Sequence, residues 1–175
     1  MRNTKLSVIF AGMLAVAPAI MSASNKVQPP KPLAEKVRHE LVMLPYYDVF
    51  DNLEFQVNGS EVTLLGQVDW PTTKSDAENV VKRIPGVTAV HNRIEVLPLS
   101  PFDNQIRRAV FRAVYSQAPL SRYAMGAVPQ IHIIVKNGNV TLEGVVGNAG
   151  DRTIAGIAAN RVPGVFSVKN DLRIG

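Results

Sequence analysis

The sequence contains two closely similar stretches: Arg83–Val96 is RIPGVTAVHNRIEV, and Arg161–Ile174 is RVPGVFSVKNDLRI. The two copies begin 78 residues apart, and each places a Pro-Gly pair between a helical pattern and an alternating one. Proline cannot continue a helix, and glycine adopts the positive φ that a sharp chain reversal requires. The repeated stretch therefore predicts a helix-to-strand corner in a domain that the chain contains twice.

The similarity extends upstream of this corner. The same offset aligns VTLLGQV from Val62 with VTLEGVV from Val140. Nearer the start of each copy the offset falls to 73, so the second copy holds about five extra residues. We expect this insertion to lie in a loop.

Each copy predicts the element order α-β-β-α-β. The opening helix has apolar residues at i, i+4 and i+8, and two alternating strands follow it. Asn58-Gly59 and Asn137-Gly138 separate these strands, and such dipeptides favour tight hairpins. The fold class expected is α+β, with two tandem sandwiches that each cover a three-stranded sheet with two helices.

Two further positions in each copy carry local predictions. Gly66 and Gly144 interrupt the second strand, which indicates a bulge or a close approach of another backbone segment. The second helix is expected to start near Thr73 in the first copy and near Asp151 in the second, since both are good N-cap residues.

The N-terminal region is typical of a secretory signal peptide. Arg2 and Lys5 precede the apolar run Leu6–Ala17, and Pro18 and several small residues follow it. The alternative, an uncleaved anchor, needs about 20 apolar residues, which is longer than this run. We expect a signal peptide at 1–24, a Pro-rich spacer at 25–32, domains at 33–98 and 101–175, and a periplasmic location.

Charge is divided unequally between the copies. The whole chain has a formal net charge of +5. Residues 26–97 hold 8 basic and 10 acidic side chains, whereas residues 98–175 hold 9 basic and 4 acidic ones. This asymmetry indicates different roles for the two copies.

The opening helix of the second copy is the strongest candidate for a binding surface. A helical projection places one set of basic and aromatic side chains opposite the apolar face, which suits an anionic phospholipid surface. The alternatives are an ordinary solvated face, or rings packed on the inserted loop or on the first copy. The candidate lipid-binding residues are Arg107, Arg108, Phe111, Arg112 and Tyr115.

A second candidate surface lies on the second helix of the same copy. Ile154, Ile157 and Arg161 point away from the predicted core face of that helix. We interpret them as a seam between the copies or as a contact with a partner protein.

The sequence lacks the patterns of an enzyme or a metal protein. It contains no cysteine, which excludes disulfides and a lipidated N-terminal cysteine. His39, His91 and His132 lack metal-ligand spacing, and no catalytic constellation or cofactor motif is present. The basic charge is too small and too poorly placed to predict nucleic-acid binding.

The ordered motifs resemble the BON domain, named for bacterial osmotically inducible and nodulation proteins. The second copy carries Val-Thr-Leu-x-Gly at 140–144, Val-Pro-Gly-Val at 162–165 and Val-x-Asn-x-Leu at 168–172. The first copy carries the same motifs, with Ile84 and Ile94 as conservative departures. Two such domains behind a signal peptide resemble the OsmY-like periplasmic group.

The resemblance implies a non-enzymatic envelope or stress protein that binds anionic phospholipid. Its alternative is a periplasmic chaperone or protein-interaction module that acts through exposed apolar strips. The partners expected are an anionic membrane surface and other envelope proteins.

Overall fold

A computed structural model of the chain describes residues 32–126 and 128–175. The predicted signal peptide at 1–24, and the spacer except for its last residue, lie outside the described residues. The described residues belong to one compact unit.

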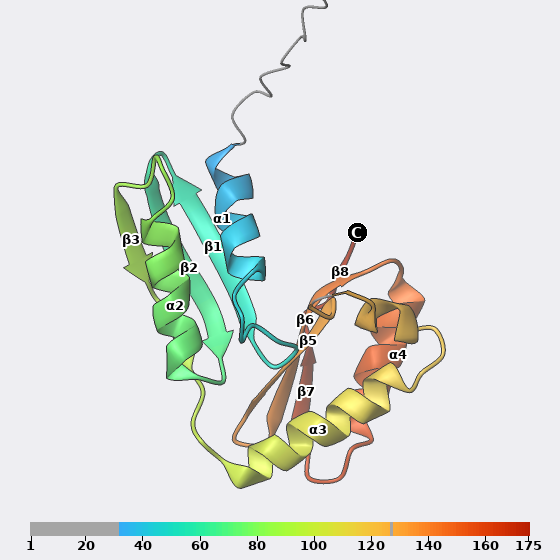
Figure 1. The fold of residues 1–175 in the computed structure, drawn as a ribbon. Helices are drawn as coiled ribbons and strands as arrows, with labels where there is room; N and C mark the ends of the chain where they lie inside the picture. Colours follow the sequence, from blue (N-terminus) through green and yellow to red (C-terminus); the bar gives the residue numbers. More distant parts are fainter. Residues whose placement is uncertain (1–31, 127) are drawn as a thin grey trace, which may run out of the picture. The chain divides into compact units, whose positions relative to one another are not determined.

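Two repeats follow one another along the chain (Figure 1), and both are α+β. The first consists of α1 (Leu33–Val42), β1 (Asn52–Asn58), β2 (Glu61–Val68), α2 (Pro71–Lys82), β3 (Ala89–Asn92) and β4 (Glu95–Val96). The second consists of α3 (Pro101–Tyr115), a 3-10 helix (Ser121–Ala124), β5 (Ile131–Lys136), β6 (Asn139–Val146), α4 (Ala149–Asn160), β7 (Ser167–Asn170) and β8 (Arg173–Ile174). The predicted order α-β-β-α-β is confirmed, except that each final strand is split into two short segments.

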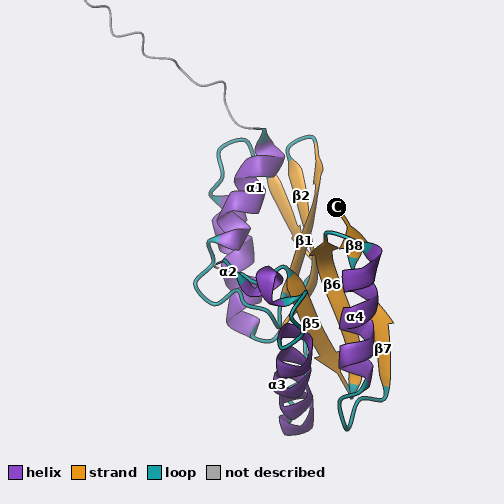
Figure 2. Cartoon of the chain, turned by 90° about the vertical axis from the view of Figure 1, so that its right-hand side faces the viewer, coloured by secondary structure: helices purple, strands orange, loops and turns teal. Residues whose placement is uncertain are grey.

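Each repeat forms a mixed sheet with its second strand in the centre. β1 pairs with β2 antiparallel, while β3 and β4 pair with β2 in parallel. β5 to β8 repeat this arrangement around β6. In the second repeat, α3 contacts β5 and α4, and α4 lies beside β6 and β7 (Figure 2). Because β2 and β6 are the central strands, β1 and β5 are the edge strands on the hairpin side of their sheets.

Both predicted hairpins are present, but their turns differ by one residue. Lys136 pairs with Asn139, so Asn137 and Gly138 form the turn, with φ of 52° and 76°. In the first repeat Asn58 is still paired with Glu61, and the turn is formed by residues 59 and 60. Gly59 supplies the positive φ there.

The glycines inside the central strands mark a close backbone approach, as predicted. Gly66 and Gly144 have φ of 100° and 122°. A Cβ atom would lie 2.0 Å from the carbonyl oxygen of Asn52 in the first case and of Gln130 in the second. At the helix-to-strand corners, Gly86 and Gly164 also have positive φ, which confirms the role assigned to the Pro-Gly pair.

The predicted N-caps at Thr73 and Asp151 are wrong by three residues. α2 begins at Pro71 with Trp70 as its N-cap, because proline at the first helical position already has the required φ. α4 begins at Ala149, and the side chain of its N-cap Asn148 accepts a hydrogen bond from the amide of Asp151 at 2.9 Å. Thr73 and Asp151 therefore lie in the first turns.

Each repeat has its own apolar core. Val37 and Leu41 of α1 pack with Val62 and Leu64 of β2 in the first. The second core is built in the same way from α3, α4 and the sheet, but it also includes Val49, which precedes β1 in the first repeat. The segment between α1 and β1 therefore contributes to the core of the other repeat.

Candidate functional site

Helix α3 positions the predicted binding residues. Ser100 caps it by accepting a hydrogen bond from the amide of Asp103 at 3.1 Å, and Pro101 occupies its first position. Ile106, Val110 and Val114 enter the core of the second repeat. This orientation places the opposite face of the helix outward.

A groove of about 350 Å³ lies on this outward face. Its lining consists of Arg108, Phe111 and Arg112 from α3 with Val49 and Phe50 from the segment before β1. The rings of Phe50 and Phe111 meet edge to face with centroids 6.3 Å apart. The groove therefore combines an apolar floor with two guanidinium groups.

The two guanidinium groups of the groove face solvent. Arg108 and Arg112 are exposed, and none of the ion pairs among the described residues includes them. Guanidinium groups without a carboxylate partner can form paired hydrogen bonds to phosphate oxygens. The chemistry of the groove thus suits a ligand with an anionic head and an apolar body.

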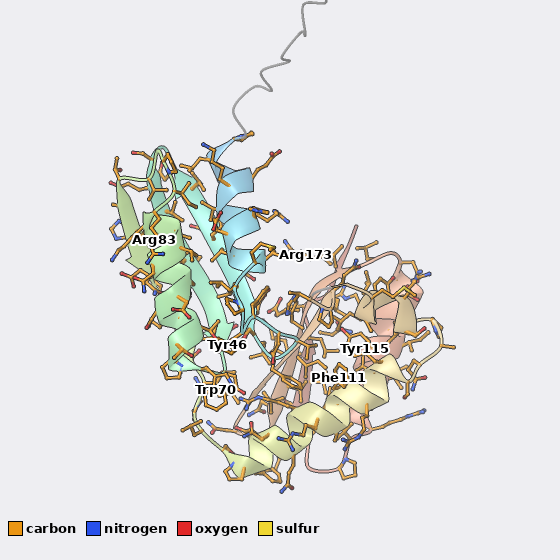
Figure 3. The ribbon with its side chains drawn as sticks, viewed as in Figure 1. Tyr46, Trp70, Arg83, Phe111, Tyr115 and Arg173 are labelled. Atoms are coloured by element: carbon orange, nitrogen blue, oxygen red, sulfur yellow. The ribbon has the colours of Figure 1, made fainter. Side chains whose placement is uncertain are left out.

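Tyr115 lies beside Phe111, as Figure 3 shows, with ring centroids 4.9 Å apart. Its hydroxyl donates a hydrogen bond to the carbonyl oxygen of Ile131 at 2.7 Å and accepts one from the amide of that residue at 3.2 Å. Burial raises the pKa of Tyr115 to about 12, although its hydrogen bond to Ile131 acts in the opposite direction. Tyr115 is thus a neutral residue that fixes the start of β5. It does not line the groove, but its ring contacts that of Phe111, which does.

The expectation that Arg107 lies on the outward face is wrong. Only 2 % of this residue is exposed, and its guanidinium lies 2.9 Å from the carboxylate of Asp69. It also donates a hydrogen bond to the carbonyl oxygen of Val135 at 3.0 Å. The helical projection gave the direction of its Cα–Cβ bond, but the long side chain ends at an acidic residue of the first repeat.

The residues of the second candidate surface have different environments. Ile154 is half-buried against the core of its own repeat, whereas Ile157 is 48 % exposed and Arg161 is exposed. Contacts between the repeats involve other residues, namely Val49 and Phe50, the pair of Asp69 with Arg107, and the pair of Glu95 with Lys136. A seam at Ile154 and Ile157 is therefore not where the repeats meet, and contact with a partner protein stays a prediction.

Sequence reasoning missed Val49 and Phe50. They stand between Asp48 and Asp51 in a short segment without periodicity, so no pattern assigned them to a core. The sequence feature that could have indicated their burial is a pair of adjacent apolar residues between two aspartates.

The acidic residues around this segment have perturbed ionisation. Asp51 is buried, and desolvation raises its pKa to about 6, although a hydrogen bond from the amide of Asp69 acts in the opposite direction. Burial lowers the pKa of His132, whose ring stacks on that of Tyr47 with centroids 5.6 Å apart. These groups lie at the junction of the repeats rather than in the groove.

Two further findings concern metal sites and membrane-spanning helices. Within the described ranges, no three His, Asp or Glu side chains are grouped so that they could hold a metal ion. Among the same residues, no helix has the length and apolar character needed to cross a bilayer.

Comparison with known proteins identifies the repeats. The family model of the BON domain matches residues 31–98 and 103–175. The chain belongs to the BON domain family. Its two tandem domains are consistent with an OsmY-like BON protein, and BON domains are associated with membrane or phospholipid interaction and with stress. BON domain proteins are generally non-catalytic.

Other comparisons add little to this assignment. No curated protein matches the chain. Two solved structures of CdsD, a structural protein of the type III secretion system of Chlamydia trachomatis, are 14% identical to it. One is described as the C-terminal domain; it covers 85% of this chain and 100% of its own, with a TM-score of 0.34. The other covers 82% and 93%, with a TM-score of 0.31.

Proposed function

We propose that this BON protein is a non-enzymatic periplasmic envelope protein that binds anionic phospholipid surfaces through its second domain. The contact is the groove formed by Arg108, Phe111 and Arg112 with Phe50. The observation that carries the proposal is the pair of exposed guanidinium groups beside an apolar floor.

Charge supports the second domain as the contact. It holds 9 basic and 4 acidic side chains over residues 98–175. Each basic residue near an anionic membrane contributes about 1 kcal/mol, so Arg108 and Arg112 together supply about 2 kcal/mol. Attachment is therefore weak, and salt screens it because the Debye length falls from about 10 Å at 0.1 M to about 3 Å at 1 M.

Vesicle co-sedimentation tests this proposal. We expect the full chain to bind vesicles that contain phosphatidylglycerol and to leave neutral phosphatidylcholine vesicles in solution. Arg108→Glu with Arg112→Glu should weaken binding by at least about 30-fold, the equivalent of 2 kcal/mol. Binding to the anionic vesicles should also decrease as salt is raised.

The matched control reverses two exposed arginines of the first domain. Arg83→Glu with Arg93→Glu changes the net charge by the same amount at positions outside the groove. Near-normal binding by this variant separates a local site from a general charge effect. Equal binding to neutral and anionic vesicles, or equal losses in the two double variants, would show that the groove is not a lipid site.

The alternative function, a chaperone or protein-interaction module, is supported by exposed apolar side chains on the second domain. Ile157 is a large apolar residue that is 48 % exposed on α4. If this surface binds client proteins, Ile157→Asp should reduce suppression of client aggregation in the absence of lipid.

A further inference from the structure

The two homologous edge strands differ in their burial. In β5, the five residues Ile131 to Val135 are all buried. In β1, residues 53 to 57 alternate between half-buried and exposed. The two strands are equivalent in sequence and topology, so the difference in burial indicates that another part of the chain covers β5 and not β1.

The peptide groups at the outer edge can be assigned from the sheet register. Phe55 pairs with Leu64, and Ile133 pairs with Leu142. The carbonyl oxygens of Leu64 and Leu142 accept hydrogen bonds from Arg93 and Asp171, which lie on the opposite side of the central strand. In an antiparallel pair, the peptide groups of Phe55 and Ile133 therefore face the outer edge of the sheet.

In the second domain this edge is occupied. The amide of Ile133 donates a hydrogen bond to the carbonyl oxygen of Val49 at 2.8 Å, and Val49 itself is buried in the adjoining core. On the same edge, Arg107 donates a hydrogen bond to the carbonyl oxygen of Val135. Tyr115 donates one to the carbonyl oxygen of Ile131. A turn of the first domain, residues 48–51, thus covers the edge with one backbone contact and two apolar side chains.

In the first domain the corresponding edge is open at Phe55, while Tyr47 occupies its start with a hydrogen bond to the backbone of Leu53. Within the described part of the chain, no backbone or side-chain acceptor is bonded to the amide of Phe55. A groove of about 590 Å³ runs here between α1 and β1, with Leu53, Phe55 and Val57 along the strand. An uncovered strand edge is a template for the addition of another strand.

The rim of this groove carries two arginines and one glutamate, Glu54, so its formal charge is +1. Arg38 of α1 and Arg173 of β8 line it and are exposed, and neither belongs to an ion pair among residues 32–126 and 128–175. Figure 3 shows Arg173 beside α1. The segment that fills the other edge places its apolar pair between Asp48 and Asp51.

We infer that the first BON domain docks a short segment of another polypeptide on the edge of β1, with one of its backbone carbonyls bonded to the amide of Phe55, two adjacent apolar side chains in the groove and flanking carboxylates at Arg38 and Arg173. The turn that covers β5 is the internal example of this contact. The partner is recognised by this backbone hydrogen bond and by the apolar-acidic pattern, and the site is separate from the proposed lipid groove.

A peptide taken from the chain itself is a suitable probe. Residues 46–52 have the sequence YYDVFDN, which contains the segment that covers β5. In the full chain that edge is already occupied, so we expect saturable amide shifts in β1, centred on Phe55 and Val57, and increased protection of the Phe55 amide from hydrogen exchange. A control peptide with serine in place of Val49 and Phe50 should cause no such shifts.

Charge reversal tests the role of the rim. Arg38→Glu with Arg173→Glu should weaken binding of the probe by at least about tenfold, because two charge-assisted contacts become repulsive. Arg108→Glu with Arg112→Glu has the same net charge and should bind the probe normally. The first variant should conversely retain vesicle binding, so failure of one site is distinguishable from failure of the other.

The outcomes divide clearly. Shifts confined to β1 and α1 support the inference. No saturable shifts up to about 1 mM peptide, or shifts centred on β5 and α3, overturn it. If the probe binds at β1 and the rim variant binds equally well, docking on the edge is supported and the preference for carboxylates is overturned.

Discussion

At the scale of single residues, Gly144 is the position in β6 where the backbone leaves no room for a side chain. Its φ is 122°, and a Cβ atom there would meet the carbonyl of Gln130.

Gly144→Ala should be strongly destabilising. The new Cβ would lie 2.0 Å from a backbone oxygen, which cannot move without disturbing the start of β5. Together with the left-handed φ, we expect a loss of about 3 kcal/mol or more in the free energy of unfolding, measured in urea.

Gly59→Ala is the matched control for this substitution. Its φ of 62° is also left-handed, but no atom lies within 4 Å of the added Cβ. The loss should be about 1 kcal/mol. Equal losses at the two positions would mean that the clash with Gln130 contributes nothing.

At the scale of elements, the helices and strands follow from the sequence, whereas their exact ends and the segment between α1 and β1 do not. Periodicity located the helices, but Pro71 and Asn148 determined where two of them begin. Residues 43–51 have no periodic pattern, and the positions of Val49 and Phe50 depend on contacts with residues more than 50 positions away. This is why two of the five groove residues, Val49 and Phe50, were not predictable.

The ionisation of Asp51 should make this segment sensitive to pH. Burial raises its pKa to about 6, above the ordinary value of 3.8, so folding favours the protonated carboxyl. The contribution of Asp51 to stability is therefore present below about pH 4 and is lost as pH rises to about 6. His132 acts in the opposite direction, since its lowered pKa makes its contribution fall as pH drops below its ordinary 6.5.

Asp51→Asn isolates the effect of this carboxyl. The difference in unfolding free energy between the variant and the original chain should shift in favour of the variant from pH 4 to pH 6, and it should stay constant above that. Urea titrations at several pH values measure this difference, from which the contribution of His132 cancels. A difference that is flat between pH 4 and pH 6 would contradict the burial of an ionisable Asp51.

At the scale of the whole molecule, duplication has given two similar domains with different surfaces. The second domain is basic, and its edge strand is covered, while the first is slightly acidic with an open edge. The sequence predicted the duplication and the charge difference, because both are properties of aligned residues. It left open that the rings of α3 pack on the first copy, as Phe111 does on Phe50. It did not predict which segment the first domain supplies, because that contact is not repeated.

The two ion pairs that join the domains should differ greatly in importance. Asp69 and Arg107 have side chains that are 18% and 2% exposed, whereas Glu95 and Lys136 are 43% and 49% exposed. Asp69→Asn leaves the Arg107 guanidinium buried without its main partner and should cost about 3 kcal/mol. Glu95→Gln removes a solvated pair and should cost less than about 1 kcal/mol.

Urea unfolding with two probes measures both effects. Trp70 is the single tryptophan and reports on the first domain, while far-ultraviolet circular dichroism reports on both. The two transitions should coincide in the original chain and in Glu95→Gln, because Val49 of the first domain is part of the second domain's core. In Asp69→Asn both should move to lower urea, and equal shifts in the two variants would show that the buried pair does not hold the domains together.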